Sequence, residues 1–351
     1  MQKQKIILTM KMTTTMMENN NHIADLWQQL EDEKNVGLVK RLYSSEIPFR
    51  IYATFQYPDS YFGIAFSFRH NIKIDISNFD NMRDLKVLLL NDSSFANTKL
   101  LIIELLHANN RDIFAILCEN LVSTIIQLNN EQIIISTVIN QLNKWKTLFD
   151  KRISDGLSVE QQQGLFGELV FLHKCLLQQD MNPLNVLKSW VGVDAALRDF
   201  QYSTWAIEVK TTATNNPQRV IINGERQLDD TLLENLFLFH CSVEVSNSNG
   251  ETLNQKIANI RYLLKSNVLA LNIFNSKLLE VGYFDTHSNK YENKSYKIRS
   301  ENFYRIADNF PRIKENELRS GVSNVKYNII LSMCDEYLIS ESELLNIIRN
   351  L

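Results

Sequence analysis

The alternation of apolar and polar residues between Arg198 and Thr212 predicts a β-hairpin in the second half of the chain. In RDFQYSTWAIEVKTT the second strand has an apolar face of Trp205, Ile207 and Val209 and an opposite face of Ala206, Glu208 and Lys210. The tight turn is expected at Ser203-Thr204. A four-residue loop over Tyr202 to Trp205 would keep the same pairing, whereas a loop of odd length would destroy it.

This register places Asp199 directly opposite Glu208. Opposed residues have Cβ atoms roughly 4.5–5.5 Å apart, and two like charges at that separation are destabilising unless a counter-charge offsets them. A divalent cation between the carboxylates would offset them, and Lys210 projects from the same face one pleat further on. This arrangement suits hydrolysis of a phosphodiester. The alternative is a solvated strand face, which an E-x-K triplet commonly marks.

A helix before the hairpin carries a third candidate carboxylate. Ser158 can cap a helix over VEQQQGLFGELVFLHKCLL, whose apolar stripe consists of Leu165, Leu169, Leu172 and Leu176. Glu168 lies at the edge of this stripe, so it is either a paired surface charge or an addition to the metal site. Gly164 and Gly167 each cost a helix roughly 1 kcal/mol relative to alanine. We therefore expect backbone or ligand to approach the helix closely at these two glycines.

The remaining pattern of the second half alternates strands with helices, as parallel neighbouring strands require. We expect strands at Val186–Val193, Arg219–Ile222, Leu236–Val245 and Val325–Leu331, and helices at Glu225–Glu234, Leu253–Ser266, Val268–Val281 and Glu341–Leu351. Ser288–Lys326 holds nine Lys or Arg against five Asp or Glu, interleaved with aromatic residues. That mixture indicates either a nucleic-acid track or a solvated pair of strands.

The first half predicts a smaller α+β domain without a constellation of chemically active residues. Its expected elements are helices at His22–Glu33, Ile113–Ile126 and Gln132–Lys151, a hairpin at PFRIYATFQY and DSYFGIAFSF, strands at NIKIDISNF and Leu85–Leu90, and a strand or helix at Lys99–Leu106. Methionines recur at positions 10, 12, 16 and 17. We therefore expect residues 1–16 to be a non-native extension, residues 17–130 to form an interaction domain, and residues 131–351 to form the domain with the hairpin and a C-terminal extension.

Composition bounds the class of protein. With 351 residues, 44% hydrophobic and 22% charged, the chain is long enough for two domains. Its formal net charge of −3 means that any contact with DNA must be a local patch. The four cysteines are scattered without a C-x-x-C pair, which indicates a reducing cytoplasm and argues against structural zinc. No apolar run approaches the length of a membrane span.

With these residues in place, the chain resembles the PD-(D/E)XK nuclease superfamily. Within it, the chain is most similar to a group of uncharacterised bacterial proteins found near restriction and phage-defence genes. The matching residues are GLFGELVFL (Gly164 to Leu172), Trp190-x-Gly192, Asp199-Phe200, Glu208-Val209-Lys210-Thr211 and Gln227-Leu228, followed by YRIADNFPRI and VKYNIIL. The likeness is clearest over residues 155–335. Arg198 stands where many members have proline.

The resemblance implies an α/β, restriction-endonuclease-like core: a helix, three strands, a helix and a strand, with a mixed sheet flanked by helices. It also implies Mg²⁺, or Mn²⁺ in its place, held by Asp199, Glu208 and the Val209 carbonyl, with Glu168 contributing from the first helix. Lys210 completes the catalytic set, and the candidate substrate-binding residues are Gln227, Thr211 and Thr212. The expected partner is DNA, with an ATPase or methyltransferase subunit and a homodimer left open.

Three functions compete for these residues. The first is a Mg²⁺-dependent DNA endonuclease of the cytoplasm, in a bacterial restriction or anti-phage setting. The second is a catalytically inactive subunit that uses the same fold to bind DNA or a protein in a defence complex, although the intact Asp199, Glu208 and Lys210 argue against it. The third is a glycosidase, whose two carboxylates lie about 5 Å apart. The adjacent lysine does not suit this third function.

Overall fold

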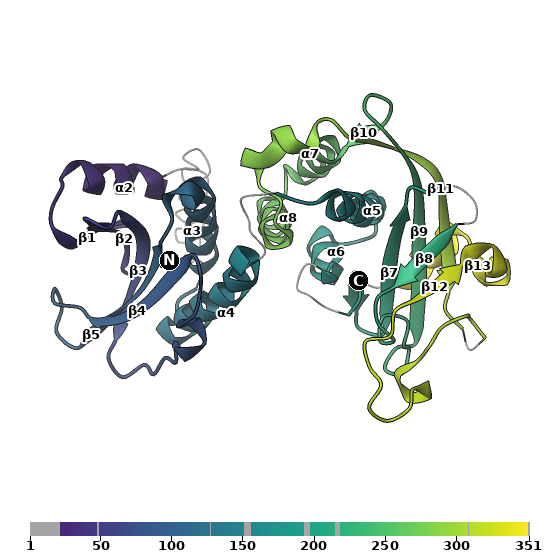
Figure 1. Ribbon diagram of the computed structural model, residues 1–351, viewed down its shortest axis with the longest axis horizontal. Helices are drawn as coiled ribbons and strands as arrows, with labels where there is room; N and C mark the ends of the chain where they lie inside the picture. The colour runs from purple at the N-terminus through teal and green to yellow at the C-terminus, as the bar shows by residue number, and fades with distance from the viewer. Residues whose placement is uncertain are drawn as a thin grey trace. The chain divides into compact units, whose positions relative to one another are not determined.

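The computed structural model describes residues 22–47, 49–126, 128–150, 156–192, 197–214, 218–307 and 309–349. The chain divides into two compact units, Met1–Asp155 and Gly156–Leu351. Each unit has its own sheet and helices, and Figure 1 labels them. The expected domain boundary after residue 130 stays a prediction, but helix α4 (Glu131–Asp150) lies within the first unit.

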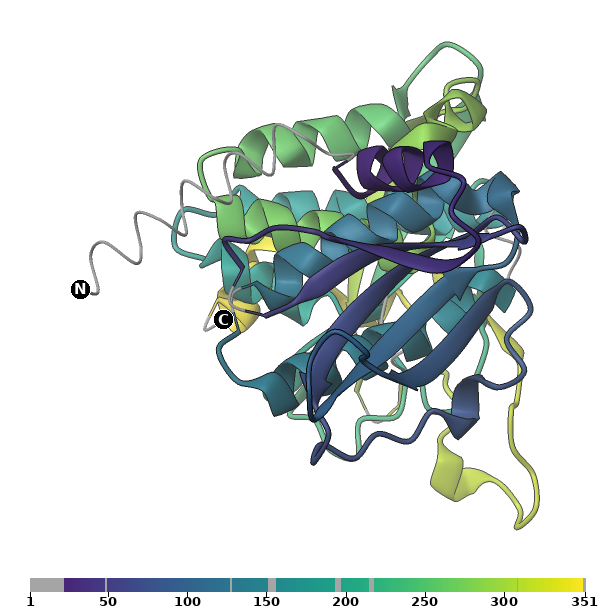
Figure 2. The same cartoon turned by 90° about the vertical axis from the view of Figure 1, so that its left-hand side faces the viewer.

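Unit 1 is built on an antiparallel sheet of five strands in the order β1-β2-β3-β5-β4. The strands are β1 (Gly37–Leu42), β2 (Ile51–Tyr57), β3 (Tyr61–Arg69), β4 (Leu85–Asn91) and β5 (Thr98–Leu105), and the helices are α2 (His22–Asp32), α3 (Arg111–Ile125) and α4. Trp27 of α2 stacks on Phe114 of α3 at a centroid distance of 5.5 Å and contacts Phe62 of β3. Figure 2, turned by 90° from Figure 1, shows the strands of this sheet in front of helices α3 and α4.

One expected strand of unit 1 is absent from the structure. Residues 71–79 form a turn, a loop and the 3₁₀ helix Ser77–Phe79, so the prediction of a strand there is wrong. The Asp75 side chain accepts a hydrogen bond from the Ser77 amide at 2.9 Å, which favours a turn over an extended backbone. Strand β1, which the sequence analysis did not identify, pairs with β2 at the edge of the sheet instead.

Unit 2 contains a mixed sheet in the order β10-β11-β9-β7-β6, with β13 paired to β11. These strands are β6 (Phe200–Tyr202), β7 (Trp205–Thr212), β9 (Asn235–Ser246), β10 (Glu251–Thr252), β11 (Ser295–Arg305) and β13 (Leu338–Ile339). Strands β7 and β9 run parallel, and the other pairs of this sheet are antiparallel. A separate two-stranded sheet joins β8 (Arg219–Ile222) to β12 (Tyr327–Ile330).

The register of the central hairpin is confirmed. In the β6–β7 pair Phe200 lies opposite Ile207, where the ladder ends. Continuing the same register by one residue sets Asp199 opposite Glu208, a pairing that stays a prediction. The turn is at Ser203-Thr204, where Ser203 takes a left-handed φ of 48°. A turn of two residues is even in length, and it therefore preserves the register on which the carboxylate pairing depends.

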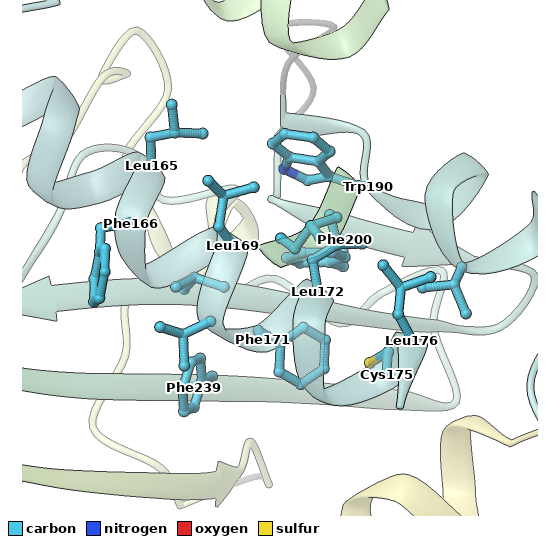
Figure 3. Close-up of a cluster of buried hydrophobic side chains, with 14 of the residues drawn as sticks. Leu165, Phe166, Leu169, Phe171, Leu172, Cys175, Leu176, Trp190, Phe200 and Phe239 are labelled. Atoms are coloured by element: carbon cyan, nitrogen blue, oxygen red, sulfur yellow. The ribbon is translucent and has the colours of Figure 1, made fainter. Parts of the chain in front are cut away.

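Helices cover one face of the mixed sheet in unit 2 (Figure 1). They include α5 (Val159–Leu176), α6 (Pro183–Ser189), α7 (Leu253–Leu264), α8 (Val268–Val281) and the terminal α9 (Glu341–Ile348). The expected cap of α5 is confirmed, since Ser158 accepts a hydrogen bond from the Gln161 amide in a capping box. The core beneath α5 contains Leu169, Phe171, Phe200 and Phe239, which Figure 3 draws with their neighbours.

The opposite face of the sheet carries a second, smaller core. It includes Ala206 of β7 and Leu238 of β9, together with residues of β8 and β12. Because side chains alternate along a strand, the residues of β7 that face this second core are Ala206, Glu208 and Lys210. The hairpin strand therefore has α5 and its core on one side and the β8–β12 sheet on the other.

Two expected elements of unit 2 are wrong. Residues 186–189 belong to helix α6, not to a strand, because Pro183 occupies the first turn and Asn182 caps it through the Leu184 amide. Residues 225–234 form turns, not a helix. The crossover between parallel β7 and β9 is thus made by β8 and this turn segment. The mixed α/β architecture, compatible with a restriction-endonuclease-like fold, is nevertheless confirmed.

Candidate active site

Asp199 lies where β6 begins and is held from two sides. Its carbonyl accepts hydrogen bonds from the amides of Val191 and Gly192 at 2.8 and 2.9 Å. Its carboxylate Oδ2 accepts a hydrogen bond from the Val209 amide of β7 at 2.6 Å. The backbone pairing of β6 with β7 ends at Phe200 and Ile207. Beyond Ile207, the Val209 amide therefore bonds to the side chain of Asp199 and not to the backbone of β6.

Glu208 and Lys210 form an ion pair beside Asp199. The Lys210 Nζ lies 2.7 Å from Glu208 Oε1, and the two side chains are 14% and 2% exposed. Within the described part of the chain, the buried Glu208 Oε2 has no hydrogen-bond partner. An unpartnered, buried carboxylate oxygen is costly, which makes Glu208 Oε2 a candidate ligand for a cation.

Glu168 reaches the same group of charges from helix α5. Its Oε2 accepts a hydrogen bond from the Trp190 indole Nε1 at 2.7 Å. The charges of Asp199 and Glu208 both affect its titration, which places the three carboxylates in one electrostatic cluster. Glu168 is thus hydrogen-bonded to a buried indole, and its membership of a metal site stays a prediction.

Burial raises the pKa of all three carboxyl groups, and repulsion from a neighbouring carboxylate adds to this shift for Glu208 and Glu168. Burial raises the pKa of Glu208 to about 8, and the charge of Asp199 adds to this shift while Lys210 opposes it. Burial also raises the pKa of Asp199 to about 6, against the Val209 hydrogen bond and Lys210. Burial and Asp199 raise the pKa of Glu168 well above its usual range. The cluster therefore has too little positive charge around it, which is typical of a functional site.

The expected substrate-binding residues lie around this cluster but are largely engaged within the protein. Gln227 Oε1 accepts hydrogen bonds from Lys210 Nζ at 3.4 Å and from the Asn223 amide at 2.8 Å. Thr212 Oγ1 lies 2.8 Å from His240 Nε2. The Thr211 hydroxyl is buried against helix α5, where a Cβ on Gly167 would lie 1.8 Å from its Oγ1. Gln227 therefore orients the lysine, and Thr211 packs the helix on the strand.

The two glycines of α5 differ. A close approach occurs at Gly167, but it is made by the side chain of Thr211, which fills the space that a Cβ would need, and not by backbone or ligand as expected. No atom lies within 4 Å of a Cβ built on Gly164, so the prediction of a close approach there is wrong. The Val209 carbonyl leaves β7 on the same side as the Val209 amide, since both groups of one strand residue point to the same neighbour. It is thus directed toward the Asp199 edge.

Two residues of the site were not identified from the sequence. Arg198 donates to the backbone carbonyls of Gln227 and Arg226 at 3.2 Å and to that of Asp229, so it holds the turn segment that carries Gln227. Its charge also lowers the pKa of Glu208, after the larger effect of Lys210. The sequence signal for Arg198 was its position directly before Asp199, where the motif of the superfamily has proline. Trp190 was noted only as part of the resemblance.

The basic and aromatic segment does not form a stacking surface for bases. Its five aromatic side chains are each at most 4% exposed and belong to the two cores: Tyr291, Tyr296, Phe303, Tyr304 and Phe310. Buried rings cannot stack on nucleotides, so the interpretation of this segment as an aromatic track is wrong. In β11 the adjacent Phe303 and Tyr304 are both buried, one in each core, because successive side chains of a strand point to opposite faces of the sheet.

The donor set of the cluster fits a hard divalent cation. Glu168, Asp199, Glu208 and the Val209 carbonyl offer only oxygen atoms, as Mg²⁺ prefers. The unpartnered Glu208 Oε2 and the raised pKa values indicate a place where positive charge is wanted. Among the described residues, however, no three His, Cys, Asp or Glu side chains are already arranged to hold a metal ion. The carboxylates would have to draw together on binding.

A mixed sheet with two carboxylates and a lysine at its hairpin, and a third carboxylate on the preceding helix, defines a nuclease-like protein of the PD-(D/E)XK type. The chain matches one family model over residues 23–332, described as "Putative PD-(D/E)XK family member, (DUF4420)", and belongs to that family. No curated protein and no solved structure matches the chain. Within the described residues, no helix has the length and apolar character needed to cross a membrane.

Proposed function

We propose that the protein is a Mg²⁺-dependent endonuclease that hydrolyses phosphodiester bonds in DNA. The observation that carries the proposal is the group of charges at the hairpin: Asp199 accepts a hydrogen bond from the Val209 amide, and the neighbouring Glu208 is 2% exposed and lies 2.7 Å from the Lys210 ammonium. A buried glutamate beside a half-buried aspartate lowers the stability of the folded protein, and binding of a cation would offset that cost.

The carboxylates of Asp199 and Glu208, the Val209 carbonyl and Glu168 would hold the cation, with Mn²⁺ as a substitute for Mg²⁺. When bound, a divalent cation supplies Lewis acidity toward a phosphate oxygen and an attacking water. Asp199 is already oriented for this role, because the Val209 amide fixes Oδ2. Burial keeps competing bulk water away from these groups, which strengthens each electrostatic interaction in the site.

Lys210 supplies a fixed positive charge next to the place where the phosphate would bind. Its ammonium contacts Glu208 Oε1 and Gln227 Oε1, so its position is set by two acceptors from different elements. Neutralisation of Glu208 by the bound cation would free the ammonium to contact the phosphate or the attacking water. A compact point charge of this kind stabilises the negative charge that develops in the transition state.

The proposed setting is the bacterial cytoplasm, in restriction or defence against phage, with an ATPase or methyltransferase as an associated subunit. The second candidate is a catalytically inactive subunit of such a complex that binds DNA or a protein. One observation favours this second candidate: the carboxylates of the described residues do not form a preassembled three-ligand metal site. The two candidates predict opposite results in the same assay.

The test is incubation of the purified protein with supercoiled plasmid and Mg²⁺, followed by gel electrophoresis. We expect nicked and linear products from the wild type and none from Asp199→Ala or in EDTA. The matched control is Asp80→Ala, which removes an exposed aspartate from unit 1. Plasmid retarded but uncut by the wild type, in Mg²⁺ and in Mn²⁺ alike, would contradict the endonuclease and support the binding subunit.

A further inference from the structure

Trp190 occupies a fixed position at the end of helix α6. Its side chain is fully buried in the core beneath α5, where Figure 3 draws it with Leu169 and Phe200. Its backbone forms an isolated bridge with Phe200, and its carbonyl accepts a hydrogen bond from the buried Lys277 Nζ of α8 at 2.5 Å. Ring and backbone are thus held from different elements, so the indole cannot turn without disturbing the core.

The one polar atom of this ring is directed at the carboxylate cluster. An indole N–H can only donate, and it must find an acceptor when it is buried. The Trp190 Nε1 donates to Glu168 Oε2 at 2.7 Å. This contact engages one oxygen of Glu168 and sets the plane of the carboxylate, so the other oxygen, Oε1, has a defined direction. A glutamate on a helix surface would otherwise sample several rotamers.

The next two residues hold the second carboxylate. The amides of Val191 and Gly192 both donate to the Asp199 carbonyl, at 2.8 and 2.9 Å. A Cβ built on Gly192 would lie 2.9 Å from Asp199 Oδ1 and 3.0 Å from Asp199 Cα. Any side chain at position 192 would therefore displace Asp199. Three consecutive residues thus place two carboxylates that come from different elements.

We propose that the segment 190–192 is a positioning clamp for the metal ligands, in which the Trp190 indole presents Glu168 and the Val191-Gly192 backbone presents Asp199. The inference rests on the proposed function, since it concerns the same site. Trp190 and Gly192 are positioning residues: they touch the ligands and not the substrate. Hydrogen-bond partners of metal ligands contribute to affinity even though they do not contact the metal, and their loss typically weakens binding by about 10- to 100-fold.

The test is the Mg²⁺ affinity of Trp190→Phe, measured by isothermal titration calorimetry without DNA. Phenylalanine keeps a buried ring but removes the donor to Glu168, so we expect the dissociation constant to rise about 10- to 100-fold. The matched control is Trp145→Phe in unit 1, because Trp145 is also fully buried but its Nε1 has no partner among the described residues. The control should bind Mg²⁺ as the wild type does.

A double-mutant cycle distinguishes positioning from a general structural role. If Trp190 acts through Glu168, then Trp190→Phe should have no further effect on Mg²⁺ affinity in a Glu168→Gln background, because the group that it positions has already lost its charge. The assignment is overturned if the free-energy losses of Mg²⁺ binding in Trp190→Phe and in Glu168→Gln add up in the double variant. The cycle uses binding alone, so it does not depend on cleavage.

Gly192→Ala gives an independent measurement should Trp190→Phe not fold. We expect it to weaken Mg²⁺ binding by displacing Asp199, whereas Gly164→Ala, the same change at a position with open space, should leave binding unchanged. Wild-type affinity in both Trp190→Phe and Gly192→Ala would overturn the clamp while the nuclease proposal stands. A wild-type protein that neither binds Mg²⁺ nor cleaves plasmid would instead contradict the proposed function itself.

Discussion

Replacing Glu208 by glutamine should stabilise the metal-free protein at neutral and alkaline pH while leaving its stability almost unchanged near pH 4.5. Glu208 is 2% exposed, and burial raises its pKa from the ordinary 4.5 to about 8. A carboxyl group with a raised pKa binds its proton more tightly in the folded chain than in the unfolded chain. The stabilisation that this proton provides is complete below pH 4.5 and disappears as the pH rises through about 8.

The magnitude follows from the size of the shift. At pH 7 Glu208 is mostly protonated in the folded protein but ionised in the unfolded chain, and one pKa unit corresponds to about 1.4 kcal/mol, so the free energy of unfolding is lower by roughly 3 kcal/mol than near pH 4.5. Glutamine stays neutral at every pH and keeps a carbonyl oxygen that can accept from the Lys210 ammonium. Burial also raises the pKa of Asp199 from its usual value to about 6, so the free energy of unfolding falls further as the pH rises between these two values. This loss occurs in both proteins and does not alter the comparison.

The assay is urea denaturation in EDTA at about pH 5, 7 and 9, with the free energy of unfolding compared between Glu208→Gln and wild type. The matched control is Glu244→Gln, which changes an exposed glutamate of the neighbouring strand β9. We expect the advantage of Glu208→Gln to grow with pH and that of the control to stay near zero. An advantage that is equal at the three pH values, or that shrinks as the pH rises, would refute the reasoning.

Lys210→Ala should abolish plasmid cleavage while the circular-dichroism spectrum stays that of the wild type. Lys210→Arg should restore little cleavage, because a planar guanidinium is not a compact point charge. Cleavage at the wild-type rate by Lys210→Ala would contradict the proposed role of Lys210. Gly167→Ala should lower the free energy of unfolding by about 1–3 kcal/mol, since its Cβ would overlap Thr211. Gly164→Ala should instead raise it by up to about 1 kcal/mol. Equal effects of the two glycine changes in urea denaturation would contradict this packing. Arg198→Met should lower the free energy of unfolding by roughly 1–3 kcal/mol by leaving backbone carbonyls of the turn segment unpaired, and a melt like that of the wild type would count against the contacts of Arg198.

Local patterns in the sequence were sufficient to predict the central hairpin and the helix before it. The two-residue period of β7 and an even-numbered turn together determine which residues oppose each other, so the pairing of Phe200 with Ile207 could be predicted without coordinates. Ser158 and the residues that follow it contain the whole capping box of α5. Each of these features depends on residues within a few positions of one another, so the local sequence is sufficient to predict it.

Short apolar runs were less informative, because length and periodicity alone do not separate a strand from a helix. Residues 186–189 form part of α6 because Asn182 and Pro183 start a helix just before them. Residues 225–234 have a helical pattern but form turns, since Arg198 binds their carbonyls from the other end of the hairpin. In the second case the competing interaction comes from a distant part of the sequence.

The contacts that complete the site were decided by the tertiary structure alone. The hydrogen bond from Trp190 to Glu168 joins two helices, and the one from Lys210 to Gln227 joins a strand to a turn. Tyr296, Phe303 and Tyr304 are likewise buried because β11 pairs with β9 inside the sheet, with a core on each face. Sequence periodicity describes one element at a time, whereas the burial, repulsion and hydrogen bonding of these carboxylates arise only when several elements pack around them.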